Sequence, residues 1–269
     1  VRLHDRFADS EQGFDLTSIQ FSLHYAFGTL SRAERMLQNA CDSLRPGGYF
    51  IGTIPDSNKL VYHLRGSKTM AYGNSVYRVE FDLPDKDNIP LFGAKYQFSL
   101  EEVVDCPEYL IYMPVLEELL SKLGMELVYK KSFSQFMQEH KDTGEGSSLL
   151  HKMQALEPYP PDGDVELMGN PSSDYDHAQE YLKSIDLEKD DHRYRVGTLS
   201  ADEWEVACLY MVFAFQKKGF LPGQVSDIAS STASDGGDQR KSPPISVNDN
   251  DNSPPPRKAV KVDSPTNEQ

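Results

Sequence analysis

The sequence predicts an α/β fold built on a partly parallel sheet, and three patterns support this. A β-prone run at Phe14–Gln20 is followed by helical spacing of apolar residues at Arg32–Leu44, and a second β-rich run spans Tyr49–Ile54. Strand, helix and strand in this order form a βαβ unit, whose two strands are parallel. A long apolar run at Glu205–Lys218 predicts a final strand, whose first residues could still be helical.

The break between the first helix and the second strand is the segment RPGG. Proline and glycine do not continue a helix, and glycine tolerates the positive φ of a tight turn. The second strand ends at Pro55. Asp56 then either helps to shape a crevice at the end of the sheet or caps the helix after it.

An inserted antiparallel hairpin is predicted next. The runs Ser75–Phe81 and Gly93–Leu100 alternate between apolar and polar residues and flank a connection rich in Pro and Asp. Helical spacing returns at Met113–Leu123, a strand is predicted at Met125–Phe133, and residues 134–155 have a helical pattern.

The last third of the chain changes in composition. Residues 158–192 are acidic and rich in Pro, Asp and Gly, which predicts a loop with one helix around Tyr175–Lys183. Ser200 precedes Glu203 by three residues, the spacing of a helix capping box. From Gly219 the chain loses its periodicity, so we expect residues 219–269 to form a disordered tail.

Composition excludes several classes of function. A formal net charge of −15 argues against a surface that coats nucleic acid non-specifically, which needs clustered Lys and Arg. Three cysteines without a CxxC pair offer neither a zinc site nor a disulfide framework, and the histidines show no metal-ligand spacing. No apolar run approaches the length of a membrane span. The chain starts at Val1, which suggests a fragment.

Hydrogen-bonding and aromatic residues crowd the end of the first strand. In an open α/β sheet, ligands bind beyond the carboxyl ends of the strands. Gln20, Phe21, His24 and Tyr25 are in that position and are predicted to face a crevice. From the pattern alone, His24 and Tyr25 could equally cap a helix and fill the edge of the core.

Longer stretches resemble the mRNA cap guanine-N7 methyltransferase family. The resemblance rests on FDLTSIQFSLHYAF, CDSLRPGGYFIGTIPDS, IPLFGAKYQFSLEEVVDCPEYLIY, KMQALEPYP and GTLSADEWEVACLYMVFAF, in order from about Phe14 to Lys218. It implies a class I S-adenosylmethionine-dependent methyltransferase fold, a Rossmann-like sheet of seven strands that ends with an antiparallel strand. Residues 1–218 would be the C-terminal part of that domain, with an acidic lobe at about 158–192.

The resemblance also implies site residues. Gln20 and Tyr25 would line the pocket of S-adenosylmethionine, the methyl donor, while His24, Glu108 and Tyr210 would hold the cap guanine. Without the resemblance, Glu108 would more often be a surface charge and Tyr210 a core residue. No acid–base catalytic group is expected, because guanine N7 already carries a free lone pair.

One feature of the family pattern is missing. No acidic, glycine-rich DxGxGxG-type turn occurs in the 269 residues. We therefore expect a sheet incomplete at its N-terminal half, half of a cofactor site and an unprotected edge at the first strand. Besides cap methylation, two functions stay open: a truncated, non-catalytic product that binds partners, and a methyltransferase for a small molecule.

Partners and location follow from the resemblance and the charge. Capped mRNA is the expected substrate, the capping machinery associated with RNA polymerase II the setting, and the nucleus the location. A small basic activating subunit is expected at the acidic lobe. The basic clusters RKSPP and PPPRKAVK could form a weak nuclear-localisation signal or merely solvate the tail, and Ser242, Ser253 and Ser264 precede prolines.

Overall fold

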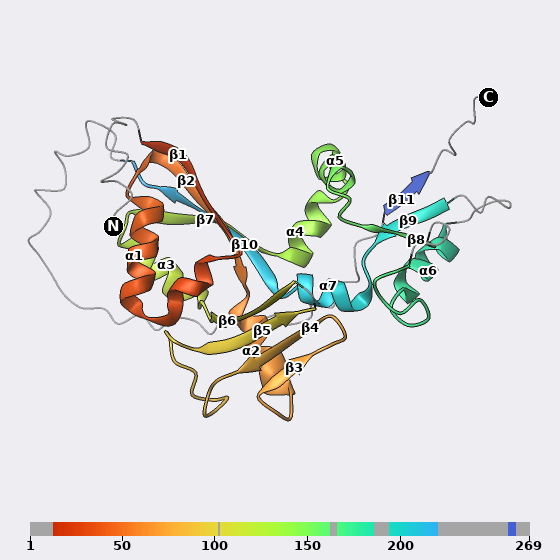
Figure 1. Cartoon of the computed structure of the whole chain (residues 1–269). Coiled ribbons are helices and arrows are strands. Elements are labelled where there is room, and N and C mark those ends of the chain that lie inside the picture. Colours follow the sequence, from red (N-terminus) through yellow and green to blue (C-terminus); the bar gives the residue numbers. More distant parts are fainter. Residues whose placement is uncertain (1–12, 102, 162–165, 186–193, 220–257, 262–269) are drawn as a thin grey trace, which may run out of the picture.

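The computed structural model describes residues 13–101, 103–161, 166–185, 194–219 and 258–261, and its strands form three sheets (Figure 1). The first sheet contains, in spatial order, β1 (Phe14–Gln20), β2 (Leu44–Pro55), β10 (Tyr210–Lys217) and β7 (Met125–Ser132). β1 and β2 are parallel, and β10 lies antiparallel between β2 and β7. The predicted parallel unit and antiparallel final strand are confirmed.

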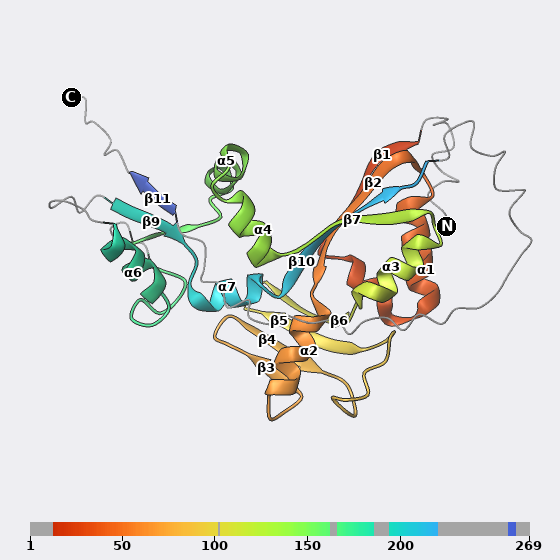
Figure 2. The same cartoon turned by 180° about the vertical axis from the view of Figure 1, so that it is seen from behind.

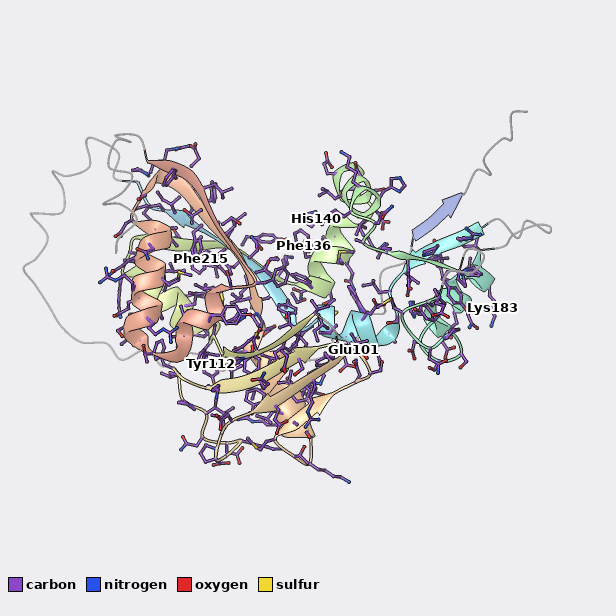
Figure 3. All side chains as sticks on the ribbon, viewed as in Figure 1. Glu101, Tyr112, Phe136, His140, Lys183 and Phe215 are labelled. Carbon is purple, nitrogen blue, oxygen red and sulfur yellow. The ribbon has the colours of Figure 1, made fainter. Side chains whose placement is uncertain are left out.

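Two helices cover one face of this sheet. α1 (Leu30–Cys41) and α3 (Met113–Ser121) pack their apolar sides on alternate residues of β2 and β10, among them Phe50 and Phe213, which are fully buried. Phe215, one position further along the same face of β10, points into this core (Figure 3).

The opposite face and the outer edge of the sheet carry exposed apolar residues. Leu16, Tyr49 and Val128 are each more than two-fifths exposed. Within the described residues β1 pairs on one side only, with β2. The unprotected edge predicted for the first strand is therefore present.

The predicted hairpin belongs to a larger antiparallel sheet. Its strands are, in order, β3 (Ala71–Gly73), β4 (Tyr77–Phe81), β5 (Lys95–Leu100) and β6 (Val104–Tyr109). α2 (Ser57–Gly66) joins it to the first sheet and packs Leu60 and Leu64 into its core. The side chain of Asp56 accepts a hydrogen bond from the backbone N–H of Asn58, so Asp56 is the N-cap of α2.

The remaining elements build a lobe that extends beyond the ends of β7 and β10, away from α1 and α3 (Figure 2). Its parts are α4 (Phe133–His140), α5 (Gly144–Lys152), β8 (Glu157–Tyr159), α6 (Asp176–Ser184), β9 (Tyr194–Thr198) and α7 (Ala201–Ala207). The Ser200–Glu203 capping box predicted for α7 is present in both of its hydrogen bonds.

Several element boundaries differ from the sequence prediction. α1 ends at Cys41 rather than Leu44, because β2 begins at Leu44 and includes the RPGG segment. The helical pattern of 134–155 is two helices, since Thr143 caps a new helix at Gly144. In the predicted tail, Lys258–Lys261 form strand β11, which pairs with β9; the other residues beyond 219 lie outside the described part.

Candidate functional site

A cavity of about 380 Å³ lies where the second sheet meets β10, α7 and the chain after β1. Its walls come from six elements and from the residue directly after β1. The lining residues are Phe21, His24, Tyr25, Phe98, Leu100, Val104, Glu108, Phe133, Val206, Ala207 and Tyr210. Most of these side chains are apolar, so the few polar groups among them decide what the cavity can bind.

Glu108 is the buried acid of the cavity. It lies on β6, is 3 % exposed, and faces Tyr96 across the β5–β6 ladder. The hydroxyl of Tyr96 donates a hydrogen bond of 2.7 Å to Oε2 of Glu108. β6 is an edge strand of its sheet, which is the position where a strand tolerates a proline such as Pro107 next to the acid.

The second oxygen of Glu108 meets the short 3₁₀ helix Leu23–Gly28. Oε1 accepts a 3.4 Å hydrogen bond from the hydroxyl of Tyr25 and lies 3.1 Å from Nε2 of His24. That imidazole contact is an ion-pair distance without hydrogen-bond alignment, and neither ring nitrogen of His24 has a hydrogen-bond partner among the described residues. His24 is 1 % exposed and lines the cavity, so its nitrogens lack both solvent and a hydrogen-bond partner among the described residues.

Aromatic rings form the wall beside this polar group. The rings of Phe21 and Tyr210 meet edge-on with centroids 5.1 Å apart, and Phe133 lies 5.9 Å from Tyr210. Phe21 has a φ of +53°, which is rare for a residue with a side chain, and its N–H is held by the carbonyl of Thr53. This backbone strain fixes a half-exposed ring at the mouth of the cavity.

The tyrosines around Glu108 stay protonated. Burial, followed by the negative charge of Glu108, raises the pKa of Tyr210, and burial raises that of Tyr96 well above its usual range. Burial is the largest cause for Tyr25 as well, ahead of its contacts with Cys106 and Glu108. At neutral pH all three hydroxyls are therefore hydrogen-bond donors.

The structure brings together four of the five site residues that the resemblance implies. His24, Tyr25, Glu108 and Tyr210 line one cavity. Gln20 is not among its lining residues; it is exposed at the end of β1, where its side-chain oxygen accepts a hydrogen bond from Thr53.

Sequence reasoning missed several residues of the site, among them two that shape its polar and aromatic parts. Tyr96 holds the carboxylate of Glu108, and Phe133 closes the aromatic wall. Alternation along β5 marks Tyr96 as inward-facing, but only the register of β5 and β6 reveals that it stands opposite Glu108. No pattern in the sequence places Phe133 beside Phe21.

Two negative findings apply to the described residues. No cluster of three or more His, Cys, Asp or Glu in them could hold a metal ion. None of their helices is both long and apolar enough to cross a membrane.

The sequence profile of the mRNA (guanine-N(7))-methyltransferase domain matches residues 1–218. The chain belongs to this family. The family predicted from the sequence motifs is thereby confirmed, and with it the Rossmann-like α/β class of the first sheet.

Related enzymes from animals and plants agree. The mRNA cap guanine-N(7) methyltransferase of Drosophila melanogaster is 39% identical over 219 residues, which cover 81% of this chain and 48% of the fly protein. That of Caenorhabditis elegans is also 39% identical, over 80% of this chain and 56% of its own length. Methyltransferase 1 of Oryza sativa subsp. japonica is 36% identical over 78% of this chain and 49% of its own. The chain thus spans about half the length of these relatives.

Among solved structures, an S-adenosylmethionine-dependent methyltransferase from Clostridium acetobutylicum aligns with 78% of this chain and 61% of its own at a TM-score of 0.35 and 12% identity. The fold assignment therefore rests on the family match and on the strand order of the first sheet.

Proposed function

We propose that the cavity is the guanine-binding part of an mRNA cap guanine-N7 methyltransferase site. One observation carries the proposal: a carboxylate that is 3 % exposed, Glu108, opens onto a cavity with aromatic walls and stands next to a buried histidine without hydrogen bonds. The family match supports it, since relatives named as cap methyltransferases share this part of the chain.

The proposed recognition follows from the edge of guanine. Guanine presents N1–H and the N2 amino group side by side, and the carboxylate of Glu108 can accept from both. Adenine would turn an acceptor toward the same carboxylate. His24, Tyr25 and Tyr210 complete the pocket in this proposal: the imidazole offers a polar partner, and the rings of Phe21 and Tyr210 give apolar surface to the purine.

Methyl transfer to N7 requires little acid–base catalysis from the protein. N7 carries a lone pair, so no side chain needs to remove a proton before it attacks. The protein's task is to hold the purine in line with the methyl group in a cavity that accepts positive charge on the ring. The fixed negative charge of Glu108, held by Tyr96, suits that task.

The described residues fit one side of S-adenosylmethionine, the proposed methyl donor. Gln20 and Tyr25 are the candidates to hold it: Gln20 is exposed at the carboxyl end of β1, the usual ligand position of such a sheet, and Tyr25 faces the cavity. When bound, the donor supplies a methyl group activated by its sulfonium. A glycine-rich turn for the rest of the donor does not occur in the sequence.

The test is the substitution Glu108→Gln with two cap dinucleotides, one ending in guanosine and one in adenosine. We expect the affinity for the guanosine cap to fall about 10- to 100-fold, because hydrogen bonds to a charged acceptor contribute about 1.5–3 kcal/mol. Affinity for the adenosine cap should change little. Turnover on capped RNA, wherever the chain supports it, should fall in parallel.

Asp105→Asn is the matched control. Asp105 lies on β6 as well but points away from the cavity, where it accepts hydrogen bonds from Gln97 and Ser99. Its replacement should leave both affinities unchanged. Undiminished guanosine preference in Glu108→Gln would overturn the assignment, and methylation of free purines in place of capped RNA would favour a small-molecule methyltransferase.

We extend the proposal to partners and location. Capped mRNA would be the substrate and the nucleus the place of action, within the capping machinery of RNA polymerase II. A small basic activating subunit would bind the acidic lobe at residues 158–192. Reversing the charges of Asp186, Glu188, Asp190 and Asp191, which lie outside the described residues, should weaken such binding; unchanged binding would exclude that surface.

A further inference from the structure

The third sheet, which lies in the lobe, consists of β8, β9 and β11. One edge of β9 is covered by another segment of the same chain. β9 pairs with β8 on one side, and on the other side it pairs antiparallel with β11, Lys258–Lys261 (Figure 1). About sixty residues of sequence separate the two strands. An uncovered strand edge presents unpaired N–H and C=O groups that an extended peptide can join.

In the register of this pair, no two basic residues stand directly opposite each other. Lys258 stands opposite Gly197 and Lys261 opposite Tyr194, while the apolar position Val260 stands opposite Arg195. Like charges directly across an antiparallel ladder are destabilising. The positions of the two lysines are thus compatible with the single basic residue of β9.

The charge of the sequence that precedes β9 favours a basic strand. Residues 158–192, which lead up to β9, contain ten Asp and Glu against two Lys. The segment 257–261 carries Arg257, Lys258 and Lys261 among five residues. Opposite charges on a docking strand and its receptor attract and steer the encounter.

β9 also connects to the proposed guanine cavity. Its last residue, Thr198, is fully buried, and two residues later Ser200 caps α7. α7 then contributes Val206 and Ala207 to the cavity wall. β11 therefore pairs with the strand that leads, through α7, directly to this wall.

We propose that the outer edge of β9 is a strand-docking site filled in cis by the C-terminal segment Lys258–Lys261. Backbone hydrogen bonds between β9 and β11 hold the segment in place. Attraction between the basic segment 257–261 and the acidic residues of 158–192 favours this segment over other peptides. Ser264, three residues beyond the strand and followed by proline, is where added negative charge would weaken the docking. This inference is independent of the proposed methyl transfer.

Hydrogen exchange of the full chain tests the pairing. In Ala259→Pro/Val260→Pro, proline removes the N–H groups of two adjacent strand residues, so at least one ladder hydrogen bond is lost. We expect the β9 amides that point toward β11 to exchange at least about tenfold faster, while those that point toward β8 keep their protection. Val247→Pro, in the same C-terminal region outside the strand, should change neither set. Equal β9 exchange in all three chains would overturn the proposal.

Peptide binding tests the selection of the occupant. A fluorescent peptide with the sequence of residues 256–265 should bind the double-proline chain at least about fivefold more tightly than the wild-type chain, whose site is filled. The same peptide phosphorylated at Ser264 should bind the double-proline chain more weakly. Equal affinity of the peptide for both chains, or no loss upon phosphorylation, would contradict the proposal.

Discussion

The carboxylate of Glu108 accepts hydrogen bonds from neighbouring tyrosines and retains the capacity to accept more from a ligand. Tyr96 donates at 2.7 Å to one oxygen, whereas the contact from Tyr25 to the other is a long 3.4 Å. A buried acid with one strong internal donor keeps its orientation and retains acceptor capacity for a ligand. Tyr96 is thus a positioning residue for Glu108.

Tyr96→Phe tests this role. Loss of one buried hydrogen bond should reduce affinity for a guanosine cap by about tenfold, in line with about 1–1.5 kcal/mol per bond. The apolar ring is kept, so far-UV circular dichroism should be unchanged. A purely structural role would lower affinity for guanosine and adenosine caps equally; our expectation is a loss confined to guanosine.

His63 gives a pH prediction at the same scale. Burial lowers the pKa of this α2 residue, and the charge of Glu205 opposes the shift only in part. The unfolded chain therefore binds the proton first, so the free energy of unfolding should fall as pH drops from the ordinary histidine value of about 6.5 through the lowered pKa. His63→Gln should show a shallower fall. Urea unfolding at pH 7.5 and 5 measures the difference, and parallel pH curves would contradict it.

At the scale of elements, close packing at β2 fixes the first sheet. Gly52 stands opposite Phe213 of β10, and a Cβ at position 52 would come within 2.4 Å of the Phe213 ring and 2.7 Å of the Ile19 carbonyl oxygen. Only glycine leaves room for this ring beside β2. The same strand then ends at Pro55, beside Tyr210 of the cavity.

Gly52→Ala should lower the free energy of unfolding by about 1–3 kcal/mol, the usual cost of overpacking a core. Gly66→Ala at the end of α2 is the control, because no atom lies within 4 Å of its added Cβ. That change should be neutral or slightly stabilising, since alanine favours helices. Equal stability of the two variants in urea would show that the sheet adapts at Gly52.

At the scale of the whole molecule, the proposed guanine pocket is more complete than the proposed binding site of the methyl donor. Every polar group proposed for guanine lies in the cavity, whereas Gln20 stands outside its lining and the sequence has no glycine-rich turn. Calorimetry of this chain with S-adenosylmethionine should accordingly give weak or undetectable binding. A full-length relative is the positive control, and micromolar binding by this chain would contradict the expectation.

The elements and the cavity differ in how far sequence could predict them. Periodicity identified β1 at its exact bounds and the capping box at Ser200, because both are local patterns. It extended α1 too far, since the start of β2 at Leu44 depends on pairing with β1. Periodicity did not predict β11, because these four residues of a polar tail form a strand only by pairing with the edge of β9.

By itself, the sequence determined the family, the α/β class and five residues of the cavity, because these rest on residue types and their local order. Only the tertiary structure decided that Tyr96 holds Glu108, that Phe21 takes a left-handed backbone at the cavity mouth and that Gln20 stands apart. The physical reason is register: which side chains meet across two strands depends on pairing between segments far apart in the chain, and local propensity does not encode it.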